Sequence, residues 1–160
     1  MSAAGALLTG TWTADQLKTL GTSPSAGDLF FGPGGKVYKF VLYNSGAGTV
    51  AAVAGNIAYY YAPSGASAGA TTTVTSDLSD SAGLGAGVLQ AAPATGEYCW
   101  VQIKGPATIT PALTAGADGN ALTPVGATDG TLDVSAATTD AICAYAIDAS
   151  AKLIACEFPF

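Results

Sequence analysis

Apolar and polar residues alternate in short runs along most of the chain, a pattern typical of β-strands rather than of helices. Between residues 36 and 43, Tyr38, Phe40 and Leu42 fall on one side of the run, and the other side is also apolar. A strand that is apolar on both sides is expected to have both faces covered. The same reasoning predicts strands at 57–61, 71–75, 98–104, 108–113, 121–125, 131–134, 142–147 and 152–158.

Turn-forming residues separate these runs at short intervals. The chain contains 21 Gly and eight Pro, and Gly-Pro, Asp-Gly and Asp-Ala-Ser sequences favour tight turns. Residues 32–36 (Gly-Pro-Gly-Gly-Lys) are expected to form a hairpin turn, Gly105-Pro106 to close a strand, and 62–70 and 76–87 to form loops. Short strands at this spacing predict an all-β fold: a small barrel or sandwich of antiparallel strands.

The first 27 residues differ from the rest and form a separate region in the predicted organisation. Thr13 and Gln16 have the spacing of a capping box, and Gly21 is a suitable C-terminal stop, so a short helix is expected at 14–20. Residues 1–12 are small and apolar without periodicity, and are interpreted either as an extended arm or as a packed N-terminal strand. The β-rich domain then covers 28–160, as one unit or as two lobes, 28–86 and 87–160.

The charge of the chain excludes several kinds of partner. It has no His, no Arg, only five Lys and a net charge of −6. Nucleic acid is therefore not an expected partner, because phosphate binding needs clustered basic residues. No membrane contact is expected either: the longest apolar run, 46–62, is broken by Gly and Asn and has no basic flanks. No charged n-region of a signal peptide precedes Ala6-Leu7-Leu8.

Candidate chemistry is sparse, and we expect neither a catalytic site nor a cofactor. The three cysteines have no metal-binding spacing and no histidine to activate a thiol, which favours buried, reduced side chains. Most carboxylates lie in turns, where Asp stabilises the backbone. A weak calcium hypothesis places ligands at Asp77, Asp80 and Ser81, although their spacing matches no EF-hand. A glycosidase needs only two carboxylates, but neither Glu has a convincing context.

Several bulky apolar residues are candidates for a subunit interface. At the N-terminal end these are Leu7, Leu8 and Trp12, and at the C-terminal end they are Phe158 and Phe160. Either set can dock on a partner subunit or pack within the chain. Tyr59, Tyr60 and Tyr61 place at least one ring on each side of a strand, which fits either core packing with one exposed ring or an interface patch.

One stretch of the chain resembles the capsid decoration, or cement, proteins of tailed bacteriophages. The resemblance rests on Gly87-Val88-Leu89, on a Gly-x-Tyr-x-Trp-Val-Gln-x-x-Gly strand at 96–105, and on Ala144-Tyr145-Ala146-Ile147. The resemblance covers the second half of the chain, and the first half is similar only in its general residue composition. It implies a small β-rich protein that binds the major capsid protein on the outside of an icosahedral head, often as a trimer. The family has no shared active site.

The sequence therefore predicts a structural virion protein, assembled in the host cytoplasm and located on the capsid exterior, rather than an enzyme. The alternative is a head fibre or another virion surface module that binds host glycans or a receptor through tyrosine-rich loops. In either case a homo-oligomer is expected, with a trimer favoured by the resemblance.

Overall fold

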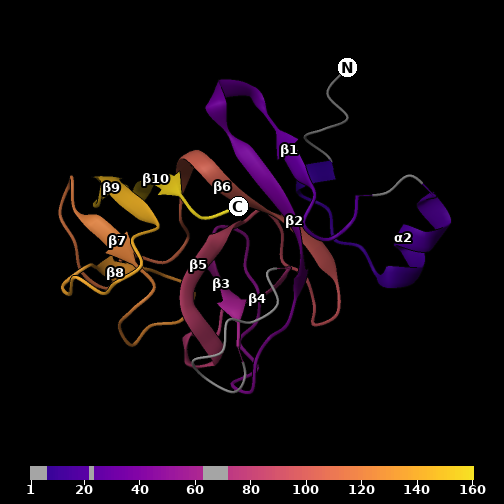
Figure 1. Ribbon diagram of the computed structural model, residues 1–160, viewed down its shortest axis with the longest axis horizontal. Coiled ribbons are helices and arrows are strands. Elements are labelled where there is room, and N and C mark those ends of the chain that lie inside the picture. The colour runs from indigo at the N-terminus through magenta and orange to yellow at the C-terminus, as the bar shows by residue number, and fades with distance from the viewer. Residues whose placement is uncertain (1–6, 22–23, 63–71) are drawn as a thin grey trace.

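A computed structural model describes residues 7–21, 24–62 and 72–160 (Figure 1). Within these described residues, helix α2 (Ala14–Leu20) precedes ten strands and two short 3₁₀ turns, Pro33–Gly35 and Leu78–Asp80. The strands are β1 (Leu29–Phe31), β2 (Val37–Tyr43), β3 (Ile57–Tyr61), β4 (Thr73–Thr75), β5 (Ser81–Leu89), β6 (Tyr98–Thr108), β7 (Ala121–Thr123), β8 (Asp133–Val134), β9 (Ala144–Asp148) and β10 (Leu153–Glu157). The expected all-β class is confirmed.

Five of the strands close into a barrel. Their order is β2, β4, β3, β5 and β6, and β6 returns to pair with β2. The β2–β4 pair is parallel, and the other four pairs are antiparallel. Closure leaves these strands without free edges over their paired lengths, and β1 extends the barrel as an antiparallel hairpin with β2. The turn of this hairpin is the 32–36 segment, as the sequence predicts.

The long strand β6 takes part in a second sheet as well as in the barrel. Its first half belongs to the barrel, and its second half pairs with β10, beyond which the sheet continues in the order β9, β7 and β8. The β7–β8 and β9–β10 hairpins turn at Asp129-Gly130 and Asp148-Ala149-Ser150, as expected. In Figure 1 this second sheet lies at one end of the long axis and α2 at the other.

One hydrophobic core runs through the barrel and under the second sheet. Val41, Tyr43 and Tyr59 fill it from the barrel, and Ile154 and Phe158 fill it from the C-terminal strand and tail. Ile154, Cys156 and Phe158 share one side of the C-terminal segment, since all three are buried while Glu157 is exposed. The alternating pattern thus places large side chains where the two sheets share one interior.

The expected loop at 76–87 is wrong for its second half, which forms most of β5. This strand has the sequence Ser-Ala-Gly-Leu-Gly-Ala-Gly-Val-Leu, and such glycine content is unfavourable in a strand unless another group must approach closely. A Cβ atom at Gly85 would lie 2.7 Å from the ring of Phe158, and one at Gly87 would lie 2.9 Å from the Gln102 carbonyl oxygen. Close packing against β5 therefore overrides the turn propensity of its glycines.

Two further strand limits need correction. Gly105-Pro106 does not close β6, which continues to Thr108, because Gly105 adopts a φ of +86° where the strand bends into the second sheet. The segment 108–113 forms no separate strand beyond the end of β6. The expected loop at 62–70 falls mostly outside the described residues.

Candidate interaction surfaces

The N-terminal segment lies against the outer wall of the barrel. Trp12 forms a backbone bridge with Tyr98: the Trp12 N–H donates to the Tyr98 carbonyl oxygen at 3.0 Å, and the Tyr98 N–H donates back at 2.8 Å. The Trp12 ring also packs on Phe40, with their centroids 5.6 Å apart. For residues 7–12 the structure therefore supports the packed alternative rather than a free arm. Residues 1–6 lie outside the described part.

This contact covers a second, smaller apolar cluster on the outside of the barrel. Tyr38, Phe40 and Trp100 form its buried centre, and Leu8 and Trp12 are partly buried against it. Tyr38 and Phe40 of β2 and Trp100 of β6 lie on the outer side of their strands. The N-terminal segment that covers them explains why these strands are apolar on both sides in the sequence. Leu8 and Trp12 are packed within the chain, whereas Leu7 remains 53% exposed.

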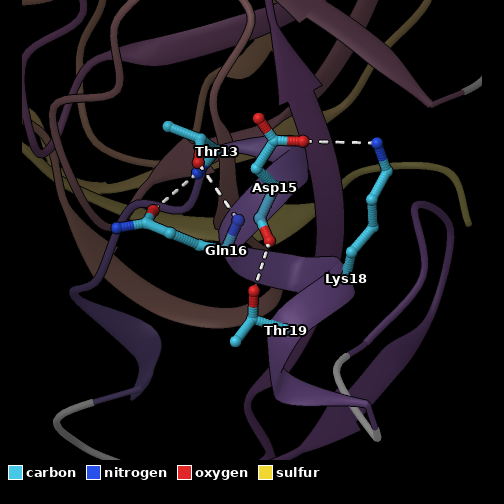
Figure 2. Close-up of polar contacts among 5 residues, drawn as sticks. All are labelled: Thr13, Asp15, Gln16, Lys18 and Thr19. Carbon is cyan, nitrogen blue, oxygen red and sulfur yellow. Dashed lines mark hydrogen bonds and ion pairs between the residues drawn. The ribbon is translucent and has the colours of Figure 1, made fainter.

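Helix α2 follows directly and is held by local polar contacts (Figure 2). The Thr13 hydroxyl accepts from the Gln16 N–H at 3.2 Å, and the Gln16 side chain accepts from the Thr13 N–H at 2.8 Å. Lys18 forms an exposed ion pair with Asp15, and the Thr19 hydroxyl donates to the Asp15 carbonyl oxygen. The predicted helix limits and capping box are confirmed, but the helix buries no residue completely.

A cavity of about 450 Å³ opens between α2, the N-terminal segment and the barrel wall. Five of the residues that line it are apolar and large, and a proline and a carboxylate complete the lining: Leu7, Trp12, Leu17, Leu20, Trp100, Pro24 and Asp28. Leu20 is 57% exposed. The cavity is therefore an aromatic and aliphatic recess with one carboxylate beside it, which is suited to receiving an apolar group.

The three consecutive tyrosines do not form a surface patch. Tyr59 is fully buried, its hydroxyl donates to the Thr131 carbonyl oxygen, and burial raises its pKa. Tyr60 is also buried, and its hydroxyl accepts a hydrogen bond from the ammonium group of the buried Lys39 at 3.0 Å. Tyr61 is half-buried. The core-packing interpretation therefore describes Tyr59 and Tyr60, which have almost no surface for a partner.

The two C-terminal aromatic residues lie in opposite environments. Phe158 is fully buried in the main core, so it is not a surface residue in the folded chain. Phe160 is 65% exposed, and the ammonium group of Lys104 lies 5.6 Å from its ring centroid. Of the proposed interface residues, Leu7 and Phe160 are thus the ones with large exposed surfaces.

Sequence reasoning missed an apolar face on the second sheet. Tyr145 and Ile147 point outward from β9 and are each 45% exposed, whereas the intervening Ala146 is buried. Tyr145 lies opposite Ala155 of β10 and Ala121 of β7, so small side chains surround its ring. The signal in the sequence was the Ala-Tyr-Ala-Ile alternation at 144–147, which places the two large residues on one side of the strand and the two alanines on the other.

The carboxylates of the acidic loops accept hydrogen bonds from backbone N–H groups of neighbouring loops. The Asp77 carboxylate accepts from the Gly48 N–H at 2.8 Å and from the N–H and hydroxyl of Ser79. Asp80 accepts from the Ala47 N–H, and Asp129 accepts from the Leu78 N–H. Burial alone would raise the pKa of Asp77, but these hydrogen bonds outweigh it and lower the pKa. The structure supports loop bridging over the calcium hypothesis.

The remaining polar groups offer little for catalysis. Burial raises the pKa of the Cys99 and Cys156 thiols to about 12 and that of Cys143 further, so all three are protonated at neutral pH. In residues 7–21, 24–62 and 72–160 no three Cys, Asp or Glu side chains are grouped to hold a metal ion. Nor does any helix in this part of the chain have the length and hydropathy to cross a membrane.

Comparison with protein-family models, with curated proteins and with solved structures finds no match for this chain. The candidate surfaces therefore rest on the geometry alone. They are the recess beside α2 at one end of the molecule and the outer face of the second sheet at the other (Figure 1).

Proposed function

We propose that this chain is a capsid decoration protein that binds the outer surface of a tailed-phage head through the recess beside α2. The single observation that carries the proposal is that recess, which is lined by two tryptophans and three leucines; Leu7 and Leu20 are more than half exposed, Trp12 and Leu17 are partly buried, and Trp100 lies buried behind them. Exposed apolar residues gathered around one recess are a feature of interaction sites. Leu7, already an interface candidate from the sequence, is at its rim.

The distribution of ionisable groups supports a structural rather than a catalytic role. Carboxylates such as Asp77 and Asp148 bind N–H groups of loops, and the buried Lys39 binds a tyrosine hydroxyl. These groups stabilise the fold that presents the recess. The stretch that resembles decoration proteins, at 96–105, lies largely on β6, the strand that joins the barrel to the second sheet and contributes Trp100 to the lining of the recess.

The glycan-binding alternative has less support. It relied on tyrosine-rich loops, but Tyr59 and Tyr60 lie on a strand and are buried. Binding of sugars by stacking needs an accessible aromatic face; Tyr145 is exposed, but it lies on strand β9 and not in a loop rich in tyrosine. We therefore propose shell binding alone.

The test uses purified protein and expanded phage heads that lack it, with binding measured by co-sedimentation. Leu7→Asp and Leu20→Asp place a charge at exposed rim positions of the recess, and we expect each to weaken binding at least tenfold. Val53→Asp is the matched control, because Val53 is 44% exposed on a loop of the barrel that does not line the recess. Saturable binding that is equally strong for all three variants would contradict the proposed surface, and no binding of the unmodified chain would contradict the function.

A further inference from the structure

We infer that the outer face of the second sheet is a contact between two copies of this chain, related by a two-fold axis. This face consists of the outward side chains of β7, β9, β10 and the second half of β6, together with Phe160, and is called the β9–β10 face below. Shell binding is assigned to the opposite end of the molecule (Figure 1), so contact between copies does not depend on it.

The β9–β10 face is apolar at its centre. One row across four strands reads Ala121, Tyr145, Ala155 and Pro106, in paired register. Next to it, Leu153 of β10 is half-buried between Asp148 of β9 and the exposed Thr108 of β6, and Ile147 of β9 adds an exposed apolar side chain. The tyrosine ring is thus the one large projection of its row, with small residues on either side.

The charge of this face is compatible with a second copy as its occupant. The chain carries a net charge of −6, so two copies repel each other wherever acidic surfaces meet. On the β9–β10 face the next row holds Lys104 and Glu157, which are paired in register and form an ion pair with each other. The row is therefore locally neutral. The recess beside α2, by contrast, has Asp28 at its border, and Asp15 of α2 lies close to it.

The same ion pair makes the face self-complementary. Lys104 and Glu157 lie side by side on adjacent strands at the same level. A two-fold axis through this row places the Lys104 ammonium group of one copy toward the Glu157 carboxylate of the other, and the reverse. In an isologous contact both copies use the same surface, so the Lys104–Glu157 pair between the copies forms twice, once on each side of the axis. Phe160, under the Lys104 ammonium group, extends the apolar area beside the pair.

The size of the face sets the strength of the contact. Tyr145 and Ile147 are 45% exposed and Phe160 is 65% exposed; at about 200 Å² for each large side chain, they leave roughly 300 Å² open. Four strands and five residues span roughly 19 Å by 16 Å. This is below the ~800 Å² per partner of a stable interface, so a weak, reversible dimer is expected.

The test is sedimentation equilibrium of the purified full chain over a wide concentration range. We expect a monomer–dimer equilibrium with a dissociation constant on the order of 10⁻⁵ M, as suits a small interface. Tyr145→Asp is expected to raise this constant at least tenfold, and Val53→Asp, on an exposed loop of the barrel, to leave it unchanged. The resemblance to decoration proteins implies a trimer instead, and a trimer would overturn the two-fold contact.

Charge reversal provides the sharper experiment. Lys104→Glu puts two carboxylates on each copy, and Glu157→Lys puts two ammonium groups on each copy, so each variant alone should dimerise at least tenfold more weakly. An equimolar mixture of the two should associate at least as tightly as the unmodified chain. Lys18→Glu makes the same change in net charge at the exposed Lys18–Asp15 pair and is the control.

Circular dichroism checks that each variant keeps its β-structure. If the mixture remains as weak as either variant alone, or if Lys18→Glu weakens the dimer equally, the proposed contact is wrong. An unmodified chain that stays monomeric at the highest concentration would also refute it. None of these results depends on phage heads, so they leave the proposed shell binding to its own test.

Discussion

Replacement of Phe158 by alanine tests how the C-terminal tail contributes to the fold. Phe158 follows the last strand and is fully buried between β5 and the second sheet. Its ring occupies the space that a side chain at Gly85 would need, within 2.7 Å of a Cβ built there. The Phe158 N–H also donates to the Ile103 carbonyl oxygen at 3.1 Å, which fixes the tail on β6.

The cost of this substitution follows from what surrounds the ring. Phe-to-Ala changes in protein cores reduce the free energy of unfolding by about 3–5 kcal/mol, and the cost is greater where the site cannot collapse. Here one wall of the site is β5 in a closed barrel, which cannot move inward without breaking its pairing with β3 and β6. We therefore expect a loss of about 4 kcal/mol, a large part of the 5–15 kcal/mol of a typical domain.

Urea unfolding followed by tryptophan fluorescence measures this loss. Trp12 and Trp100 lie in or against the barrel wall, so their emission reports on the folded state. Phe160→Ala is the matched control, because that ring is 65% exposed, and it should change the free energy of unfolding by less than about 0.5 kcal/mol. A loss below about 1 kcal/mol for Phe158→Ala, or equal losses for the two variants, would refute the assignment of Phe158 to the core.

Three further predictions concern stability and reactivity. The backbone N–H of Ala137 lowers the pKa of Asp140, and that of Ala151 lowers the pKa of Asp148, below the ordinary value of 3.8. The stability that these carboxylates add is therefore present above pH 3.8 and is lost as the pH falls through their folded-state pKa values. Unfolding midpoints that do not change between pH 6 and pH 2.5 would contradict this. The buried thiols should not react with a disulfide reagent at pH 8 until urea unfolds the chain, and rapid reaction in the native state would be inconsistent with their burial. Thr13→Ala should reduce the local stability of α2 by about 1 kcal/mol and speed amide exchange in this helix. The global unfolding midpoint should not shift, because the helix buries no residue. A shift of that midpoint would show that the helix supports the core.

The parts of the fold that local chemistry determines could be predicted from the sequence. The capping box at Thr13 and Gln16 and the C-terminal Gly21 define α2 within one helix turn, and the prediction matches its limits. The Asp-Gly and Asp-Ala-Ser turns likewise place two hairpins of the second sheet. In these places the residues that decide the structure are neighbours in the chain, so their spacing is sufficient.

The parts that depend on distant contacts were harder to predict. Gly85 and Gly87 resemble turn residues until Phe158 and Gln102 are seen to occupy the space next to them. For Tyr59, Tyr60 and Phe158 the sequence leaves core packing and an interface as alternatives, because the side chains that cover them come from distant parts of the chain. The exposed position of Tyr145 was missed because the alternation at 144–147 does not show which side of the strand faces the core.

The most direct test of the central claim is a cryo-EM map of tailed-phage particles that carry this chain. The account predicts the barrel on the outer surface of the head at symmetry-related positions, with the recess of Trp12 and Trp100 against the major capsid protein and the β9–β10 face directed away from it. Density for the chain in the tail alone, or on the head with the recess facing solvent, would contradict the proposed function.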